Sequence, residues 1–175
     1  MNIIFLGPIS SGKGTQSQMA AKKYNLLPIS TGELLRERRN KNDEIGVKIA
    51  SLQKQGRLVD DEIVLQVLEE KVKTCASDMG ILFDGYPRTL HQANLLDELL
   101  KKYDRKIDKV INLEIDDEAI VDRISGRLVC KCGETYHKIY KKTVKEGICD
   151  KCGQALYQRD DDTKEGIKRR LEVYH

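Results

Sequence analysis

The sequence lacks long apolar runs, repeats and a dominant charge sign. Its 175 residues include no stretch of about 18 apolar residues, the length that a membrane-spanning helix needs. The segment 1–7 lacks the basic residues and the length of a secretory signal. The net charge is only +3, with 34% charged residues of both signs, unlike a dedicated nucleic-acid-binding domain. These absences favour a cytosolic protein without membrane or nucleic-acid partners.

The length fits one domain, and the pattern of the chain predicts an α/β fold. Apolar runs at 3–6, 81–83 and 110–115 predict buried parallel strands. Apolar residues at helical spacing lie between and after these runs, for example Ile63, Val67, Leu68 and Val72. We therefore expect a parallel sheet flanked by helices.

Two insertions interrupt this alternation. Residues 30–59 carry helical patterns but no strand, and they begin with a capping-box signature in which Glu33 follows Ser30 by three positions. Residues 127–162 lose the helical period and contain cysteines and glycines. Two such inserts suggest flaps over a cleft, which would keep water from a phosphoryl group in transit.

A phosphate-binding loop follows the first apolar run. Gly7, four intervening residues and then Gly12-Lys13 precede a helical segment, the strand–loop–helix context of a P-loop. Backbone N–H groups at such a helix N-terminus bind anions, and Lys13 adds a positive charge that reaches phosphates. The dinucleotide motif G-x-G-x-x-G is absent. If the loop requires a positive φ at Ser10, serine is a costly residue there.

Chemistry-bearing side chains follow the second apolar run. Asp84 ends that run, where a carboxylate can hold the Mg²⁺ of a bound nucleotide. Arg88 presents a planar fork suited to phosphate, and the amide of Gln92 suits a purine edge. Further arginines could neutralise two polyphosphates: Arg36, Arg123, Arg127, Arg159 and Arg170.

Four of the five cysteines lie close together in the sequence: Cys130, Cys132, Cys149 and Cys152. In a reducing compartment, such clustering favours a metal site over disulfides. Four thiolates would hold Zn²⁺ in a closed structural site, although the spacing Cys130-x-Cys132 makes a tighter turn than the usual C-x-x-C. Cys75 stands apart and is typical of a small, partly buried side chain.

The order of these motifs resembles that of nucleoside monophosphate kinases, and the chain is similar to the long-lid adenylate kinases of bacteria. The matching motifs include 84–89 (DGYPRT) and 12–16 (GKGTQ). The resemblance implies reversible transfer of the γ-phosphoryl group of MgATP to AMP, giving ADP, by a monomer. It implies a core of residues 1–29, 60–126 and 163–175, an NMP-binding insert at 30–59 and a lid at 127–162. In the family, a last strand and helix follow the position of His175.

The resemblance also implies residue roles. ATP would contact Ser10, Ser11, Gly12, Lys13, Gly14, Thr15, Arg123, Arg127, Thr135 and Tyr136. AMP would contact Thr31, Arg36, Arg57, Leu58, Val59, Gly85, Tyr86, Pro87, Arg88, Gln92, Arg159 and Arg170. Catalysis would fall to Lys13, Asp84, Arg88, Arg127, Arg159 and Arg170, with Asp161 and Asp162 orienting arginines and Mg²⁺ waters. In the family the phosphate loop commonly has glycine at the position of Ser10.

Two other functions remain open on the residues alone. The string 40–43 matches the N-K-x-D motif of GTPase switches, but it follows a charged helical stretch rather than a buried strand. The lysines of the Cys-rich insert, interleaved with Tyr136 and Tyr140, would also suit a zinc ribbon that binds nucleic acid. ATP consumption that requires AMP separates the kinase from both.

Overall fold

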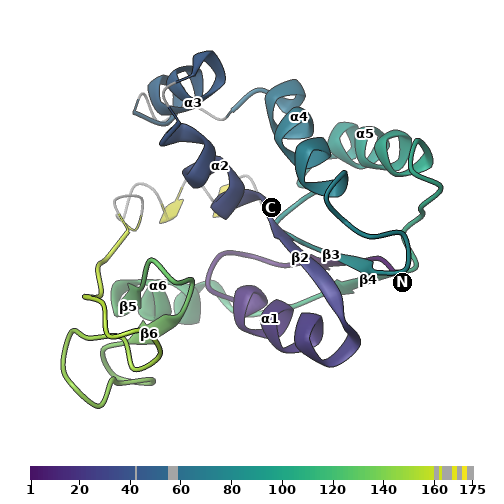
Figure 1. Ribbon diagram of the computed structural model, residues 1–175. Helices are drawn as coiled ribbons and strands as arrows, with labels where there is room; N and C mark the ends of the chain where they lie inside the picture. The colour runs from purple at the N-terminus through teal and green to yellow at the C-terminus, as the bar shows by residue number, and fades with distance from the viewer. Residues whose placement is uncertain (42, 55–58, 160–161, 163–166, 169–170, 173–175) are drawn as a thin grey trace. The chain divides into compact units, whose positions relative to one another are not determined.

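The computed structural model describes residues 1–41, 43–54, 59–159, 162, 167–168 and 171–172 (Figure 1). Among the predicted site residues, Arg57, Leu58, Asp161 and Arg170 lie outside this set. The chain groups into two compact units. The first comprises residues 1–6 and 16–112, and the second comprises residues 7–15 and 113–175.

The first unit is built on a parallel four-stranded sheet with the order β2-β3-β1-β4. Its strands are β1 (Ile3–Leu6), β2 (Leu26–Ser30), β3 (Gly80–Asp84) and β4 (Lys109–Asn112). The centre of the sheet pairs Ile4 of β1 with Phe83 of β3 and with Val110 of β4. Because β1 and β3 are parallel neighbours, their carboxyl ends lie at the same edge of the sheet.

Helices lie on both sides of this sheet (Figure 1). They are α1 (Lys13–Tyr24), α2 (Thr31–Arg39), α3 (Glu44–Lys54), α4 (Asp61–Val72) and α5 (Leu90–Lys101). The main core joins β1, β2 and β3 to α4 and α5, with Phe83, Leu68 and Leu100 fully buried. The apolar stripe predicted from Ile63 to Val72 is thus core, as are the apolar residues of α5. Burial of such side chains contributes about 1.5–3 kcal/mol each.

The second unit contains the phosphate loop, α6 (Asp117–Ser125) and the two-stranded antiparallel sheet of β5 (Arg127–Val129) and β6 (Thr135–His137). Ile120 and Ile124 of α6 pack with Ile167 and with Ile9 of the loop. A smaller cluster buries Cys130, Cys149 and Tyr136. The predicted α/β class, with a parallel sheet flanked by helices, is confirmed, and the second unit contains a cysteine cluster between residues 130 and 152.

Two strand predictions need correction. The strand β2 was not predicted; it contains Pro28 and lies at an edge of the described sheet, where proline is tolerated. The run at 110–115 was expected to be buried, but its strand is Lys109–Asn112 and all four residues are exposed. Val110 is 56% exposed; β4 is the other edge strand of the described sheet, and none of its residues belongs to the main core cluster.

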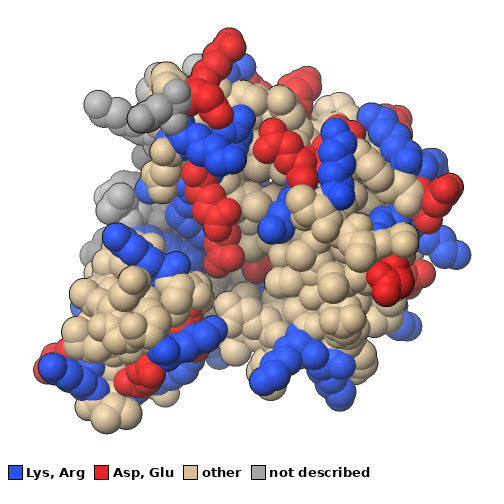
Figure 2. All heavy atoms as spheres, viewed as in Figure 1, with Lys and Arg blue, Asp and Glu red and all other residues tan. Residues whose placement is uncertain are grey.

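The predicted start of α2 is correct, but the capping hydrogen bond expected there does not form. Ser30 is the N-cap of α2, as predicted, but its side chain makes no capping hydrogen bond. Asp116 is likewise the N-cap of α6 without a side-chain bond. None of the helices formed by the described residues combines the length and the apolar character that crossing a bilayer requires. Figure 2 shows Lys and Arg interspersed with Asp and Glu on the face in view, consistent with the small net charge.

Candidate functional site

The phosphate loop, residues 7–15, joins β1 to α1. Gly7 has φ 135°, Gly12 has φ 96° and Ser10 has φ 58°. A Cβ atom at Gly7 would lie 2.4 Å from the carbonyl oxygen of Leu113, so only glycine fits there. The positive φ anticipated for Ser10 is therefore present, and it costs a non-glycine residue about 1–2 kcal/mol.

Lys13 is the first residue of α1, and its side chain folds back over the loop. The ammonium Nζ donates to the carbonyl oxygens of Gly7 at 2.5 Å and Pro8 at 2.6 Å. Gly14 and Thr15 follow in the first turn, where backbone N–H groups have no partner within the helix. The hydroxyl of Ser11 is buried without a hydrogen-bond partner among the described residues. The loop thus carries a positive charge and spare donors, as an anion site requires.

Three predicted arginines lie in the second unit. Arg123 of α6 donates from Nη1 to the carbonyl oxygen of Ser10 at 3.4 Å. Arg127, the first residue of β5, pairs through both arms of its guanidinium with Asp162, with Nε 2.9 Å from Oδ2. Arg159 is half-buried, and its carbonyl oxygen accepts from the backbone N–H of Asp162 at 3.0 Å. Two residues predicted to contact ATP, Arg123 and Arg127, and the predicted AMP contact Arg159 therefore lie in one compact unit with the loop.

A second group of predicted residues gathers in the first unit at the end of β3. The hydroxyl of Thr31 donates to the carbonyl oxygen of Gly85 at 3.1 Å, and Nε of Arg88 donates to the same oxygen at 3.0 Å. Gly85 has φ 76°, and the peptide bond between Tyr86 and Pro87 is cis. A Cβ at Gly85 would lie 3.5 Å from the Thr31 hydroxyl and 3.7 Å from Arg88 Nη2. The segment after β3 thus brings a hydroxyl and a guanidinium together.

Other predicted residues of the first unit lie at varied depths. Asp84 ends β3 and is half-buried. Arg36 of α2 folds its guanidinium over Gly32, where Nη1 would lie 3.3 Å from an added Cβ. Val59 packs against the main core. Gln92, in the first turn of α5, donates from its side-chain amide to Asp61 of α4, which was not among the predicted site residues. In the sequence Asp61 precedes the apolar stripe of α4, a position that is typical only of a helix start.

The four clustered cysteines converge in space. Their sulfur atoms all lie within 4.8 Å of one another, with Cys130 and Cys152 at 3.3 Å and Cys132 and Cys149 at 3.7 Å. All four are free thiols. A tetrahedral zinc ion with Zn–S distances of about 2.3 Å separates its sulfurs by about 3.8 Å. The cluster therefore fits a four-thiolate metal site.

The short spacing of the first cysteine pair is absorbed by a tighter turn. Gly133 donates its backbone N–H to the carbonyl oxygen of Cys130 at 3.0 Å, a span of three residues. In the second pair, Gly153 donates to Cys149 at 2.8 Å across four residues. Both glycines have positive φ, 87° and 73°. The missing residue shortens the turn and leaves both cysteines of the pair at the cluster.

The surroundings of Cys149 favour its thiolate. Burial raises the pKa of this thiol, but hydrogen bonds from the Tyr136 hydroxyl and from the backbone N–H groups of Cys152 and Lys151 outweigh burial and lower the pKa to about 6. A thiolate near neutral pH is the form that binds a metal. Tyr136 itself is buried, with its hydroxyl 3.6 Å from the Cys149 sulfur, and Thr135 precedes it in β6 as a half-buried residue.

Comparison with known proteins gives matches over almost the whole chain. The adenylate kinase family model matches residues 5–175. The chain is 46% identical to an adenylate kinase of Caldicellulosiruptor bescii, an alignment that covers 100% of this chain and 82% of the relative. It is also 46% identical to an adenylate kinase of Archaeoglobus fulgidus, covering 99% of this chain and 81% of the relative. A third adenylate kinase, from Methanothrix thermoacetophila, is 45% identical over 99% of this chain and 81% of its own length.

Proposed function

The chain belongs to the adenylate kinase family, and we propose that the two groups of residues described above bind the two nucleotides of that family's reaction. The reaction is the reversible transfer of a phosphoryl group between ATP and AMP. The observation that carries this function is the family match over residues 5–175. The proposal concerns which residues of this chain bind each substrate and how they act.

The donor nucleotide binds at the phosphate loop. The spare N–H groups of the loop and of the first turn of α1 donate hydrogen bonds to the phosphate oxygens. The Lys13 side chain moves from the backbone carbonyls of Gly7 and Pro8 to contact the β- and γ-phosphates. Arg123 lies against the base, and Arg127 and Arg159 face the migrating group. The full donor set is Ser10, Ser11, Gly12, Lys13, Gly14, Thr15, Arg123, Arg127, Thr135 and Tyr136.

The acceptor AMP binds at the cluster after β3. Arg88 holds the α-phosphate, because its planar fork matches two phosphate oxygens. The Thr31 hydroxyl and the carbonyl oxygen of Gly85, already in contact, border the nucleoside, and Gln92 reads the base. The remaining acceptor residues are Arg36, Arg57, Leu58, Val59, Tyr86, Pro87, Arg159 and Arg170.

Catalysis by these residues is electrostatic and positional. The transition state spreads negative charge over the transferred phosphoryl and the oxygens in line with it, and guanidinium and ammonium groups stabilise that charge. No side chain needs to act as a general base with a strongly shifted pKa. Mg²⁺, bound with ATP, would neutralise phosphate charge; Asp84, as a hard oxygen donor, is the residue suited to hold it through water.

The proposal also covers the metal in the lid, the domain division, the oligomeric state, the location and the partners of the protein. Zn²⁺ in the cluster of Cys130, Cys132, Cys149 and Cys152 would be structural, because four protein ligands leave no open position. The division into a core, an NMP-binding insert at 30–59 and a lid at 127–162 is part of the proposal. The proposal also includes a monomeric protein without nucleic-acid or membrane partners. It further includes a cytoplasmic location, which the five free thiols support.

The test is a coupled assay that follows ATP consumption with and without AMP. We expect consumption only with AMP present. Arg88→Lys should lower kcat/KM for AMP by about a hundredfold or more, since an ammonium cannot present the fork. Arg38→Lys is the matched control: Arg38 lies on α2 and pairs with Asp43 outside the proposed site. AMP-independent hydrolysis of GTP, or near-normal turnover of Arg88→Lys, would contradict the proposal.

A further inference from the structure

The side-chain amide of Gln92 is held at both ends. Its oxygen Oε1 accepts from the backbone N–H of Arg88 at 2.7 Å. Its nitrogen Nε2 donates to Oδ1 of Asp61, at the start of α4, also at 2.7 Å. The backbone N–H of Gln92 donates to the hydroxyl of Thr89, the N-cap of α5. Both the main chain and the amide of Gln92 are therefore fixed.

The chemistry of the two partners decides which end of the amide is oxygen. A backbone N–H can only donate, and an ionised carboxylate can only accept. Turning the amide by 180° would set its NH₂ group against the Arg88 N–H and its oxygen against the Asp61 carboxylate. Both hydrogen bonds would then be replaced by repulsive contacts, so the partners disfavour the turned amide.

After these two bonds, Gln92 retains one N–H donor and one lone pair on Oε1. A 6-aminopurine such as adenine offers an amino donor at position 6, which pairs with the amide oxygen, whereas a 6-oxopurine offers an acceptor there. To pair with a 6-oxopurine in the same place, the amide would have to turn. Asp61 and the Arg88 backbone therefore hold the orientation that suits adenine.

We propose that Asp61 is a positioning residue that fixes the Gln92 amide and thereby makes the acceptor site prefer a 6-aminopurine over a 6-oxopurine monophosphate. This inference rests on the proposed function, in which Gln92 reads the base of AMP. Asp61 itself need not touch the nucleotide. It acts through the amide that it holds.

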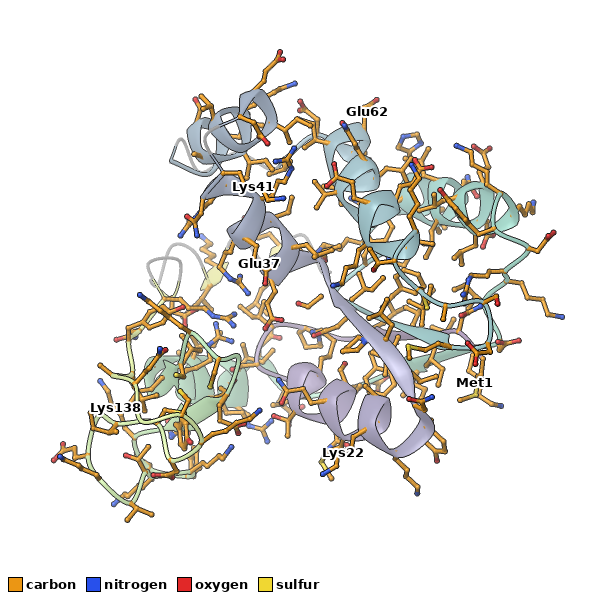
Figure 3. The ribbon with its side chains drawn as sticks, viewed as in Figure 1. Met1, Lys22, Glu37, Lys41, Glu62 and Lys138 are labelled. Atoms are coloured by element: carbon orange, nitrogen blue, oxygen red, sulfur yellow. The ribbon has the colours of Figure 1, made fainter. Side chains whose placement is uncertain are left out.

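The surroundings of Asp61 support a fixed, charged group. Its side chain is only 29% exposed, and its other oxygen Oδ2 lies 3.9 Å from Nε2 of His91. The nearby Tyr86 is 1% exposed, and its hydroxyl has no hydrogen-bond partner among the described residues. Burial, and after it the negative charge of Asp61, raises the pKa of Tyr86 to about 12. Asp61 thus acts on two residues of the proposed acceptor site, while its neighbour Glu62 is exposed on the same turn of α4 (Figure 3).

The experiment compares AMP with inosine monophosphate, which carries a 6-oxo group on an otherwise similar base. We measure kcat/KM for both acceptors in the parent protein, in Asp61→Asn and in Asp61→Ala. An asparagine can accept from NH₂ or donate to C=O, so position 61 no longer selects the orientation of Gln92, and only the Arg88 N–H still favours one. We expect the AMP-to-IMP ratio to fall by about tenfold or more in both variants. kcat at saturating AMP should change by less than about threefold, because only the acceptor base is affected.

Asp60→Asn is the matched control, since the adjacent Asp60 pairs with Lys48 at 2.9 Å instead of Gln92. Equilibrium binding of AMP and IMP gives the same ratio without turnover. A ratio within twofold of the parent in both Asp61 variants, or an equal fall in Asp60→Asn, overturns the inference and leaves the proposed function standing. A parent protein that transfers phosphate to neither acceptor overturns the proposed function and this inference together.

Discussion

The buried pair of Arg127 and Asp162 gives a sharp stability prediction. The Asp162 side chain is fully buried and that of Arg127 is 13% exposed. Asp162→Asn removes the negative charge and leaves the guanidinium nearly buried without its counter-ion. Breaking such a pair from one side costs about 3–5 kcal/mol, and we expect about 3 kcal/mol because the asparagine oxygen keeps one hydrogen bond. For a chain of this size the melting temperature should fall by about 6–12 °C.

The assay is urea and thermal unfolding followed by circular dichroism, because the chain has no tryptophan. Glu172→Gln is the control: its partner Lys168 lies 4.0 Å away, and the two side chains are 62% and 81% exposed, so stability should not change measurably. Replacing Arg127 by Met and Asp162 by Leu together should cost less than Asp162→Asn alone, since no charge is left unpaired. A loss below about 1 kcal/mol in Asp162→Asn would refute the reasoning.

Two further predictions concern the phosphate loop and the cysteine cluster. Ser10→Gly should raise the free energy of unfolding by about 1 kcal/mol, because glycine adopts a positive φ without strain; Ser10→Ala keeps the strain, and equal stabilisation by both would contradict this. Untagged protein should contain one zinc ion per chain by elemental analysis. Cys132→Ser should lower the metal content and the chelator resistance of the fold, whereas Cys75→Ser, outside the cluster, should leave both unchanged.

The tight turn at Cys130 shows what the cysteine motif predicts about the metal site and what it leaves undecided. Four nearby cysteines predict a metal site from their number and compartment alone, and their sulfurs do converge. The C-x-C spacing gave no means of deciding whether both thiols of the first pair reach the cluster. That depends on the backbone bond from Gly133 to Cys130 and on the positive φ of Gly133.

The sequence by itself determined the features that depend only on residues close together in the chain. A strand, a glycine-bounded loop and Lys13 specify a phosphate-binding turn within a few residues, and apolar side chains at helical spacing specify α4 and α5, because both follow from backbone geometry and side-chain period.

The tertiary structure alone decided which distant residues meet. Asp61 lies 31 positions from Gln92, and Arg127 lies 35 positions from Asp162, so no local pattern records either contact. The same holds for the exposed β4, since the burial of a strand depends on what packs against the faces of the sheet and not on its own apolar residues. These contacts and the exposure of β4 depend on packing between residues far apart in the chain. For this physical reason they could be assigned only from the folded structure.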